Sequence, residues 1–187
     1  SEALEQAHSM AREGAALIDI GGESTRPGAP SVSEVEELDR VMPVIEALVR
    51  ELDLPLSIDT SKSSVAAEAV AAGVEFVNDI SGLTYDPQMA AVVAASGAGL
   101  IVMHTRGKPE AMQQNTDYDD VVGDVVSSLQ QSISRAEAAG VALDKSAIDP
   151  GIGFGKDAAG NLELLRQTAT LAEFGRPIML GTSRKSF

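Results

Sequence analysis

Short apolar runs alternate along the chain with longer segments of helical periodicity. The runs are Ala16–Ile20, Leu56–Ile58, Glu75–Val77, Leu100–Met103, Ser146–Ile148 and Ile178–Leu180. Runs of this length are typical of buried strands, and strands that alternate with helices predict a parallel sheet. We therefore expect six strands in a single α/β domain over residues 1–187, with no linker or low-complexity segment.

The segments between the runs carry recognisable helix boundaries. Ser31 and Glu34 match a capping box for a helix that continues to Leu52. Gly97 and Gly140 are placed as C-terminal caps of two further helices. The expected helices cover residues 1–14, 31–52, 86–97, 118–139 and 162–173.

Two architectures fit this order: a doubly wound open sheet and a TIM (β/α)8 barrel. In an open sheet only the strands beside the switch point supply a ligand site, whereas all strands of a barrel supply it. Here every expected strand ends in polar or Gly-rich residues: 19–26, 59–61, 78–81, 104–106, 149–156 and 181–185. We therefore predict a barrel. A complete barrel has eight strands in about 250 residues, so we expect a truncated one of about six strand–helix units, incomplete at both ends.

Composition and charge narrow the class of protein. Apolar residues make up 44% and aromatic residues 3% of the chain, as in parallel sheets covered by helices. The net charge of -14 disfavours nucleic acid and anionic membranes as partners. The absence of cysteine excludes disulfides and zinc–thiolate sites. No apolar run reaches membrane-spanning length, so we expect a soluble, cytoplasmic protein.

The first three strand ends offer an arginine, a carboxylate and an amide. Arg26, in a Gly-rich loop, can hold an anion, although an ordinary loop explains the segment equally well. Thr60 or Ser61 suits a helix N-cap, which leaves Asp59 free for a ligand. Asn78 and the acid after it are adjacent, so only one of them points into the barrel mouth, and the sequence does not say which.

The later strand ends add an acid, an aromatic ring and two cations. His104 is expected to be structural, because His8 is the only other histidine. Asp149 leads into an alternating Gly loop in which Phe154 can form an apolar wall, and the spacing does not fit a dinucleotide motif. Residues 181–186 place hydroxyls and cations at the start of a helix, which predicts an anion site.

Together these positions predict a pocket for a flat ligand. Asp59, Asn78, Asp149 and Lys185 should converge there. Two carboxylates and an amide suit the donor-rich edge of a 2-amino-4-oxo heterocycle. Asp149 could accept from both an amino group and a ring N–H, each bond contributing about 1.5–3 kcal/mol, and Lys185 would meet the carbonyl side.

The motifs GGESTRPG, SIDTSKS, VNDISG, DPGIGFGK and GTSRKSF, in that order, resemble those of the dihydropteroate synthase family. The resemblance implies a (β/α)8 barrel and a transferase of folate biosynthesis, which is the sulfonamide target. The family condenses 6-hydroxymethyl-7,8-dihydropterin pyrophosphate with p-aminobenzoate, with Mg²⁺ at the pyrophosphate, and is a homodimer. The amine attacks the pterin methylene as pyrophosphate leaves.

The resemblance also assigns roles to individual residues. It implies a pterin pocket of Asp59, Asn78, Asp149 and Lys185, of which Asp59, Asp149 and Lys185 are the expected catalytic residues. It implies a mobile loop with Thr25, Arg26 and Pro27 over p-aminobenzoate, and Phe154 and Ser183 near that subsite. The family's metal-binding Asn would lie before Ser1, and its pyrophosphate-binding Arg and His beyond Phe187. We therefore expect no metal ligand in this chain, and weak or no turnover from it alone.

Two alternatives remain at this point. One is the pterin-binding domain of a methyltetrahydrofolate corrinoid methyltransferase, which shares the barrel but is not expected to carry STRPG or GTSRKSF. The other is a non-catalytic paralogue that binds pterin without condensing it. Retention of Arg26 and Lys185 disfavours the paralogue, and p-aminobenzoate binding would separate the two.

Overall fold

The computed structural model describes residues 2–26, 28–183 and 185. The strands are β1 (Ile18–Gly21), β2 (Leu56–Asp59), β3 (Phe76–Asp79), β4 (Gly99–Met103) and β5 (Ser146–Asp149). The α-helices are α1 (Glu2–Arg12), α2 (Glu34–Glu51), α3 (Ser63–Ala71), α4 (Met89–Ser96), α5 (Val121–Ala139), α6 (Ala158–Arg166) and α7 (Thr168–Leu171). Three short 3-10 turns are η1 (Met112–Gln114), η2 (Leu143–Lys145) and η3 (Ala172–Phe174).

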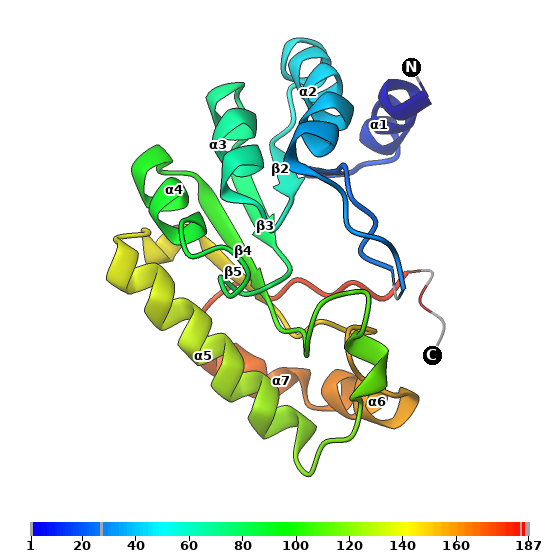
Figure 1. Ribbon diagram of the computed structural model, residues 1–187, viewed down its shortest axis with the longest axis vertical. Coiled ribbons are helices and arrows are strands. Elements are labelled where there is room, and N and C mark those ends of the chain that lie inside the picture. The colour runs from blue at the N-terminus through cyan, green and yellow to red at the C-terminus, as the bar shows by residue number, and fades with distance from the viewer. Residues whose placement is uncertain (1, 27, 184, 186–187) are drawn as a thin grey trace.

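The strands form one parallel sheet whose order, β1-β2-β3-β4-β5, is the order of the chain. A strand order that never reverses has no switch point, as in a barrel and unlike a doubly wound sheet. Each helix from α1 to α5 contacts the next α-helix along the chain. Figure 1 shows these helices in an arc outside the strands. The predicted barrel architecture is therefore confirmed, in truncated form.

The sixth expected strand, 178–180, is reduced to a single parallel bridge. Ile178 pairs with Ile148 of β5. The Ile148 N–H donates to the Pro177 carbonyl at 3.0 Å, and the Met179 N–H donates to the Ile148 carbonyl at 2.8 Å. Pro177 has no N–H of its own, so the ladder cannot extend toward the start of the segment. Within the described residues the sheet has five strands, and our expectation of six was wrong.

The strands also run further than their apolar residues predict. β2, β3 and β5 end in Asp59, Asp79 and Asp149 respectively. Backbone pairing does not require apolar side chains, and Asp59 and Asp149 hold inward positions, which at this end of a barrel face a ligand site rather than a packed core. The candidate polar residues therefore lie within rigid strands.

Several helix boundaries differ from the prediction for local reasons. The N-cap of α2 is Ser33, whose Oγ accepts from the Glu36 N–H at 3.2 Å. The same Ser-x-x-Glu pattern occurs two residues earlier, at Ser31, and the sequence did not discriminate between them. Helix α5 begins only after its N-cap, Asp120, and the segment expected at 162–173 is broken into α6, α7 and η3. The expected C-caps Gly97 and Gly140 are confirmed, both in the left-handed conformation.

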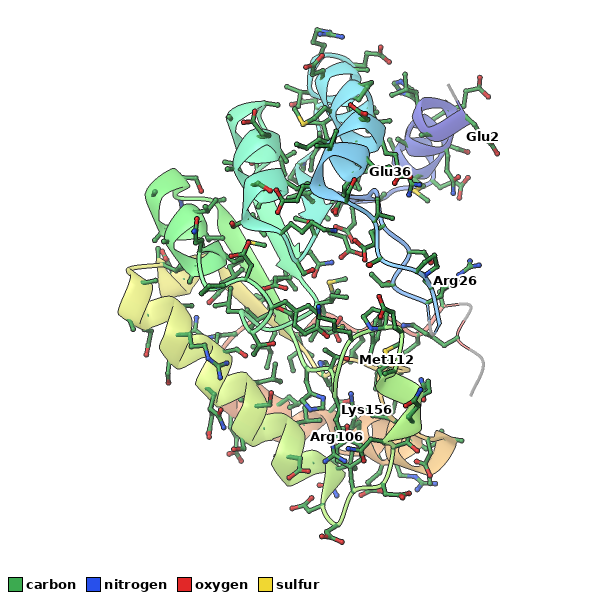
Figure 2. The ribbon with its side chains drawn as sticks, in the orientation of Figure 1. Glu2, Arg26, Glu36, Arg106, Met112 and Lys156 are labelled. Atoms are coloured by element: carbon green, nitrogen blue, oxygen red, sulfur yellow. The ribbon has the colours of Figure 1, made fainter. Side chains whose placement is uncertain are left out.

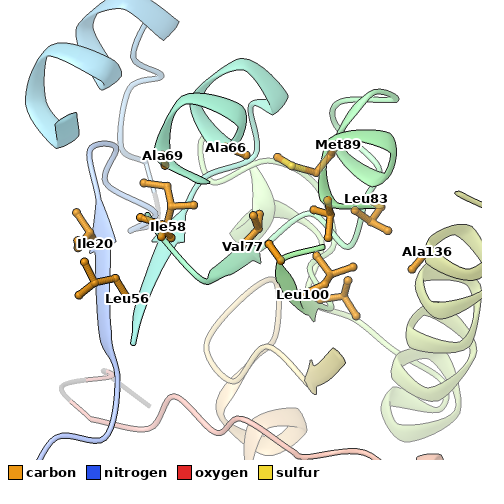
Figure 3. Close-up of a cluster of buried hydrophobic side chains, with 14 of the residues drawn as sticks. Ile20, Leu56, Ile58, Ala66, Ala69, Val77, Leu83, Met89, Leu100 and Ala136 are labelled. Carbon is orange, nitrogen blue, oxygen red and sulfur yellow. The ribbon is translucent and has the colours of Figure 1, made fainter. Parts of the chain in front are cut away.

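The main core lies between the sheet and the helices. The buried side chains of Ile58, Val77 and Leu100 point toward this layer and pack with apolar residues of the helices. Figure 3 shows the strand residues facing Ala66 and Ala69 of α3. Burial of each such aliphatic side chain contributes about 1.5–3 kcal/mol. No helix in the described part of the chain is both long and apolar enough to cross a membrane.

The alternate residues of the same strands face the interior of the barrel. Because Ile18 and Ile20 belong to the outer core, Asp19 between them faces inward. Gly99 of β4 leaves room for the ring of Phe76, since a Cβ there would lie 2.3 Å from a ring carbon. Toward the carboxyl ends this interior face becomes polar. The inward polar residues there are Asp19, Ser57, Asp59, Asn78 and Asp149, and they lie beside the apolar Ile101 and Met103.

Candidate ligand site at the carboxyl ends of the strands

Asp59 and Asn78 lie opposite each other on β2 and β3. Asp59 Oδ1 is buried and has no hydrogen-bond partner within the described residues. Burial raises the pKa of Asp59 well above its ordinary value, and the carboxylates of Asp19 and Glu37 raise it further. An unsatisfied buried carboxyl is costly, so this atom is suited to accept from, or when protonated to donate to, a bound ligand.

Neither hydroxyl after Asp59 caps α3. The N-cap is Lys62, and it makes no side-chain cap bond. The Ser63 N–H donates instead to Asp86 Oδ2 at 2.8 Å, from the segment after β3. Our expectation that Thr60 or Ser61 is the N-cap was therefore wrong, because a neighbouring unit supplies the cap. Asp59 nevertheless has no capping role.

The structure resolves the choice between Asn78 and Asp79. Asp79 shapes the turn after β3, since its two carboxylate oxygens accept from the N–H groups of Ser81 at 2.8 Å and Leu83 at 2.9 Å. Asn78 lies on the interior face, where its Nδ2 donates to Asp19 Oδ2 at 3.1 Å. Asn78 is thus the member of the pair that faces the barrel mouth.

Asp149 is a buried acid at the end of β5, with 6% of its surface exposed. Burial raises its pKa from 3.8 to about 6, against the opposing effects of the Gly151 N–H and the cations of Lys156 and Lys185. Asp149 Oδ1 accepts from the Gly151 N–H at 2.7 Å. The remaining acceptor capacity of this carboxyl is available to a ligand.

The loop that follows Asp149 is held by a buried lysine. Lys156 Nζ donates to the carbonyls of Gly151 at 2.9 Å and Phe154 at 2.8 Å. Burial lowers the pKa of Lys156 to about 7. Tyr118 Oη donates to the Gly155 carbonyl at 2.9 Å. Figure 2 shows Lys156 inside the fold near Arg106. The sequence analysis did not assign Lys156 a role.

Lys185 and Phe154 are in direct contact. Lys185 Nζ lies 4.1 Å from the centre of the Phe154 ring, a cation–π geometry. A Cβ on Gly153 would lie 2.9 Å from Lys185 Cδ, so the glycine allows the lysine to cross the loop. Burial lowers the pKa of Lys185, and the nearby charges of Asp149 and Asp59 oppose that change. The lysine therefore lies within electrostatic reach of both acids.

An apolar wall completes this part of the mouth. Ile80, Met103, Met112 and Phe154 form a buried cluster separate from the main core. Met112 belongs to η1, in the long segment between β4 and α5 (Figure 2). Gln113 Nε2 donates to the Gly153 carbonyl at 3.1 Å, which ties the same segment to the loop after β5. No sequence signal marks Met112, because η1 lies in a segment without a motif.

The loop after β1 has a fixed base. Lys62 forms ion pairs with Glu23 in the loop and with the fully buried Glu37 of α2. Burial alone would lower the pKa of Lys62, but the two glutamates raise it. Arg40 donates to the Gly22 carbonyl at 2.7 Å. Further along, the Gly28 N–H donates to the Pro109 carbonyl at 3.0 Å, so the loop also touches the segment after β4.

The remaining candidate residues are less closely associated. Thr25 lines a cavity of about 380 Å³ that also reaches Asp59 and Lys62. Arg26 is exposed on the loop surface (Figure 2). Ser183 is also exposed, and Pro27 lies outside the described residues. The structure thus brings together Asp59, Asn78, Asp149, Phe154 and Lys185, and leaves Arg26 and Ser183 at the periphery.

His104 is buried beside Lys156 and Arg106. Burial lowers its pKa to about 3, with the two cations acting in the same direction. The imidazole is therefore neutral at physiological pH. Its backbone carbonyl lies so close to Gly151 that a Cβ there would approach within 1.9 Å. His104 Nδ1 is buried and has no hydrogen-bond partner within the described residues, so the structural role expected for this histidine stays a prediction.

The acidic side chains do not form a metal site. Among residues 2–26, 28–183 and 185, no group of three or more histidine or acidic side chains is arranged to hold a metal ion. Two of the nearby acids, Glu23 and Glu37, are already paired with Lys62, which supplies positive charge there. The described residues therefore offer no cluster of three or more such side chains for Mg²⁺.

A truncated parallel barrel with two acids, an amide and a lysine at the carboxyl ends of its strands places the chain in the (β/α)8 class, whose ligands bind at that end of the barrel. All 187 residues match the family model described as "Pterin binding enzyme". The chain belongs to the pterin-binding enzyme family.

Named relatives agree with this membership. The chain is 49% identical over 185 residues to a dihydropteroate synthase of Synechocystis sp., covering 99% of this chain and 64% of that protein. A structure of Yersinia pestis dihydropteroate synthase with a sulfonamide drug has a TM-score of 0.94 at 47% identity, covering 97% of this chain and 66% of that one. A structure of the Xanthomonas albilineans enzyme with 4-aminobenzoic acid has a TM-score of 0.91 at 45% identity, covering 97% and 64%. The chain thus spans about two thirds of the length of these proteins.

Proposed function

We propose that this chain provides the pterin pocket of a dihydropteroate synthase, a transferase of folate biosynthesis. The reaction joins 6-hydroxymethyl-7,8-dihydropterin pyrophosphate to p-aminobenzoate and releases pyrophosphate. The observation that carries the proposal is the convergence of Asp59, Asn78 and Asp149 opposite Lys185. Relatives with this name, at 49% and 46% identity, support it.

The pocket chemistry suits a pterin. Asp149 accepts from the 2-amino group and the adjacent ring N–H, and its carboxylate form is needed for both bonds. Asp59 and Asn78 bind the other donor-bearing edge. Lys185 donates to the 4-oxo group, and its position over Phe154 places an apolar ring beside the ligand.

The proposed chemistry is a substitution at the exocyclic methylene of the pterin. The lone pair of the arylamine forms the new C–N bond as the C–O bond to pyrophosphate breaks, and the amine then loses a proton to solvent. Asp59 and Asp149 stabilise the electron-poor pterin, since positive charge grows on the ring as the anion departs. Lys185 holds the pterin ring in the orientation that the attack by the amine requires.

The p-aminobenzoate subsite is assigned to Thr25, Arg26 and Pro27 of the loop after β1, with Phe154 and Ser183. Thr25 already lines a cavity next to Asp59. Arg26 and Ser183 are exposed, so this assignment requires the loop to move inward when both substrates are present. The ion pair of Glu23 with Lys62 and the 3.0 Å contact at Gly28 restrain the chain on either side of Thr25 and Arg26.

Mg²⁺, a homodimer and a cytoplasmic location are further proposals, drawn from the resemblance. Since the described residues contain no group of three or more histidine or acidic side chains arranged to hold a metal ion, we place Mg²⁺ with the pyrophosphate of the substrate. Sedimentation velocity of the full-length gene product would test the dimer.

The test of function is a condensation assay on the full-length gene product. Labelled p-aminobenzoate and the pterin pyrophosphate are supplied with Mg²⁺. We expect labelled dihydropteroate, inhibition by a sulfonamide, and loss of product in Asp149→Ala. Glu163→Ala is the control, because Glu163 lies on α6 away from the mouth and should leave the rate unchanged. Pterin binding without product would contradict the synthase and favour a non-condensing pterin protein.

A further inference from the structure

One carboxylate on the inward face of the sheet has no part in the proposed chemistry. Asp19 lies on β1 between two buried isoleucines, and its own side chain is exposed in this chain. Its Oδ1 accepts from Ser57 Oγ of β2, and its Oδ2 accepts from Asn78 Nδ2 of β3 at 3.1 Å. Three adjacent strands thus contribute to one polar network directly below the residues proposed to touch the pterin.

The register of the strands places Asp19 one layer below the ligand-facing pair. Asp19 is level with Ser57, whereas Asp59 and Asn78 are level with each other and with Gly21, two residues further along β1. Gly21 has no side chain to come between Asp19 and the layer above. Asp19 can therefore reach Asn78 from beneath without occupying the ligand space.

An asparagine amide can present either its oxygen or its nitrogen to a ligand, and the partner on its other side decides which. Here the partner is Asp19, whose Oδ1 and Oδ2 both serve as acceptors. This arrangement commits one N–H of Asn78 to Asp19 and leaves Asn78 Oδ1, on the other branch of the amide, as an acceptor.

We propose that Asp19 is a positioning residue that fixes the amide orientation of Asn78 and thereby the site's preference for a ligand edge rich in N–H donors. This inference rests on the proposed function. Asp19 itself does not contact the substrate, and the hydroxyl of Ser57 helps to hold the Asp19 carboxylate in place.

The test exchanges the two side chains in the full-length protein. Asp19→Asn replaces a carboxylate that can only accept with an amide that can also donate. The side-chain amide of Asn78 is then free to flip and exchange its oxygen and nitrogen positions. Asn78→Asp places two carboxylates against each other. The double variant Asp19→Asn/Asn78→Asp restores one donor–acceptor bond. In it the amide introduced on β1 donates upward, and the other oxygen of the carboxylate introduced on β3 still accepts from the ligand.

The measured quantities are the Kd for 6-hydroxymethylpterin, the Kd for its 2,4-dioxo analogue, and the thermal midpoint. We expect Asp19→Asn to weaken pterin binding roughly tenfold and to reduce the preference for pterin over the dioxo analogue by a similar factor. The double variant should regain most of the affinity lost in Asn78→Asp. Because the readout is a change of preference, a purely structural role for Asp19 would not produce it.

Two outcomes would overturn the inference alone: pterin binding by Asp19→Asn that equals the wild type, or a double variant no better than Asn78→Asp. Wild-type protein that binds no pterin would overturn the proposed function as well. If Asp19→Asn fails to fold, Ser57→Ala takes its place. We expect Ser57→Ala to reduce the preference for pterin over the dioxo analogue by a smaller factor. An unchanged preference in Ser57→Ala would refute the role of Asp19.

Discussion

Asp149 is buried as a carboxyl group and is also the acid expected to bind the pterin. Burial raises its pKa to about 6, so at neutral pH the folded protein holds a carboxylate that would be more stable in water. Asp86 is the opposite case. Burial disfavours its charge, but the hydrogen bonds from Ser63 and Gln88 together outweigh burial and lower its pKa. The charge of Asp149 therefore lowers the stability of the fold, whereas the charge of Asp86 raises it.

This contrast leads to a prediction about Asp149→Asn. At pH 8 we expect the variant to gain about 1–3 kcal/mol of stability, because it no longer buries a charge. Pterin affinity should fall about 10- to 100-fold through loss of a charged acceptor. The control, Asp86→Asn, should lose stability and keep its affinity. Urea unfolding and calorimetric titration measure the two quantities, and a destabilised Asp149→Asn would contradict the argument.

The same carboxyl predicts opposite pH dependences for binding and folding. The pKa of Asp149 is higher in the folded protein than its ordinary value of 3.8, so the folded state binds the proton more tightly than the unfolded state does. The contribution of Asp149 to stability therefore falls as pH rises from 3.8 to about 6. Pterin affinity should rise over the same interval, since the carboxylate is the binding form. Titrations between about pH 4.5 and 8 would show the rise, and its persistence in Asp149→Asn would assign it to another group.

At the scale of elements, the loop after β5 depends on close backbone contacts. Gly151 and Gly97 both have φ +70, yet a Cβ on Gly151 would lie 1.9 Å from the His104 carbonyl, whereas nothing lies within 4 Å at Gly97. The two glycines therefore share a backbone requirement and differ in steric surroundings.

Alanine substitution at these two positions separates the effects. Gly97→Ala should cost about 1–2 kcal/mol, the usual penalty for the left-handed conformation. Gly151→Ala should cost at least about 2 kcal/mol more, because β4 and the loop must move apart. Thermal unfolding measures the difference. Equal losses would mean that the loop moves freely and that Lys156 does not hold it.

The sequence predicted the elements that carry strong local signals. Alternating apolar runs predicted the parallel α/β order, polar residues at every strand end predicted the barrel, and acids at strand ends identified Asp59 and Asp149 as candidates. Asp19 was missed because it lies within an apolar run, and its link to Asn78 depends on the register of three strands. Lys156 was missed because its partners are backbone carbonyls, which leave no mark in side-chain spacing. Residues 178–180 look like a strand, but pairing is limited by Pro177.

At the scale of the whole molecule, net charge opposes compactness. The chain has 14 basic and 28 acidic residues, for a net charge of -14. Many of the acids lie on the exposed faces of helices, as Glu2 and Glu36 do in Figure 2. Folding brings these like charges closer together than they are in the unfolded chain.

Salt should therefore stabilise the protein. Raising NaCl from about 0.05 to 0.5 M shortens the screening length severalfold, and we expect a gain of about 1 kcal/mol, seen as a rise of a few degrees in the thermal midpoint. Glucose at matched osmolality is the uncharged control. A fall in the midpoint would mean that ion pairs such as Lys62–Glu37 contribute more than the general repulsion.

The two faces of each strand also bear on how this protein can evolve. On β2, Ile58 packs against the helices while Asp59 lines the mouth. A new side chain at an inner position changes which molecules are accepted and leaves the apolar packing of the outer face in place. Inherited resistance to an inhibitor of this pocket can therefore arise by single substitutions without loss of the fold. Substitutions on the outer face disrupt apolar packing, and selection removes them because the protein no longer folds.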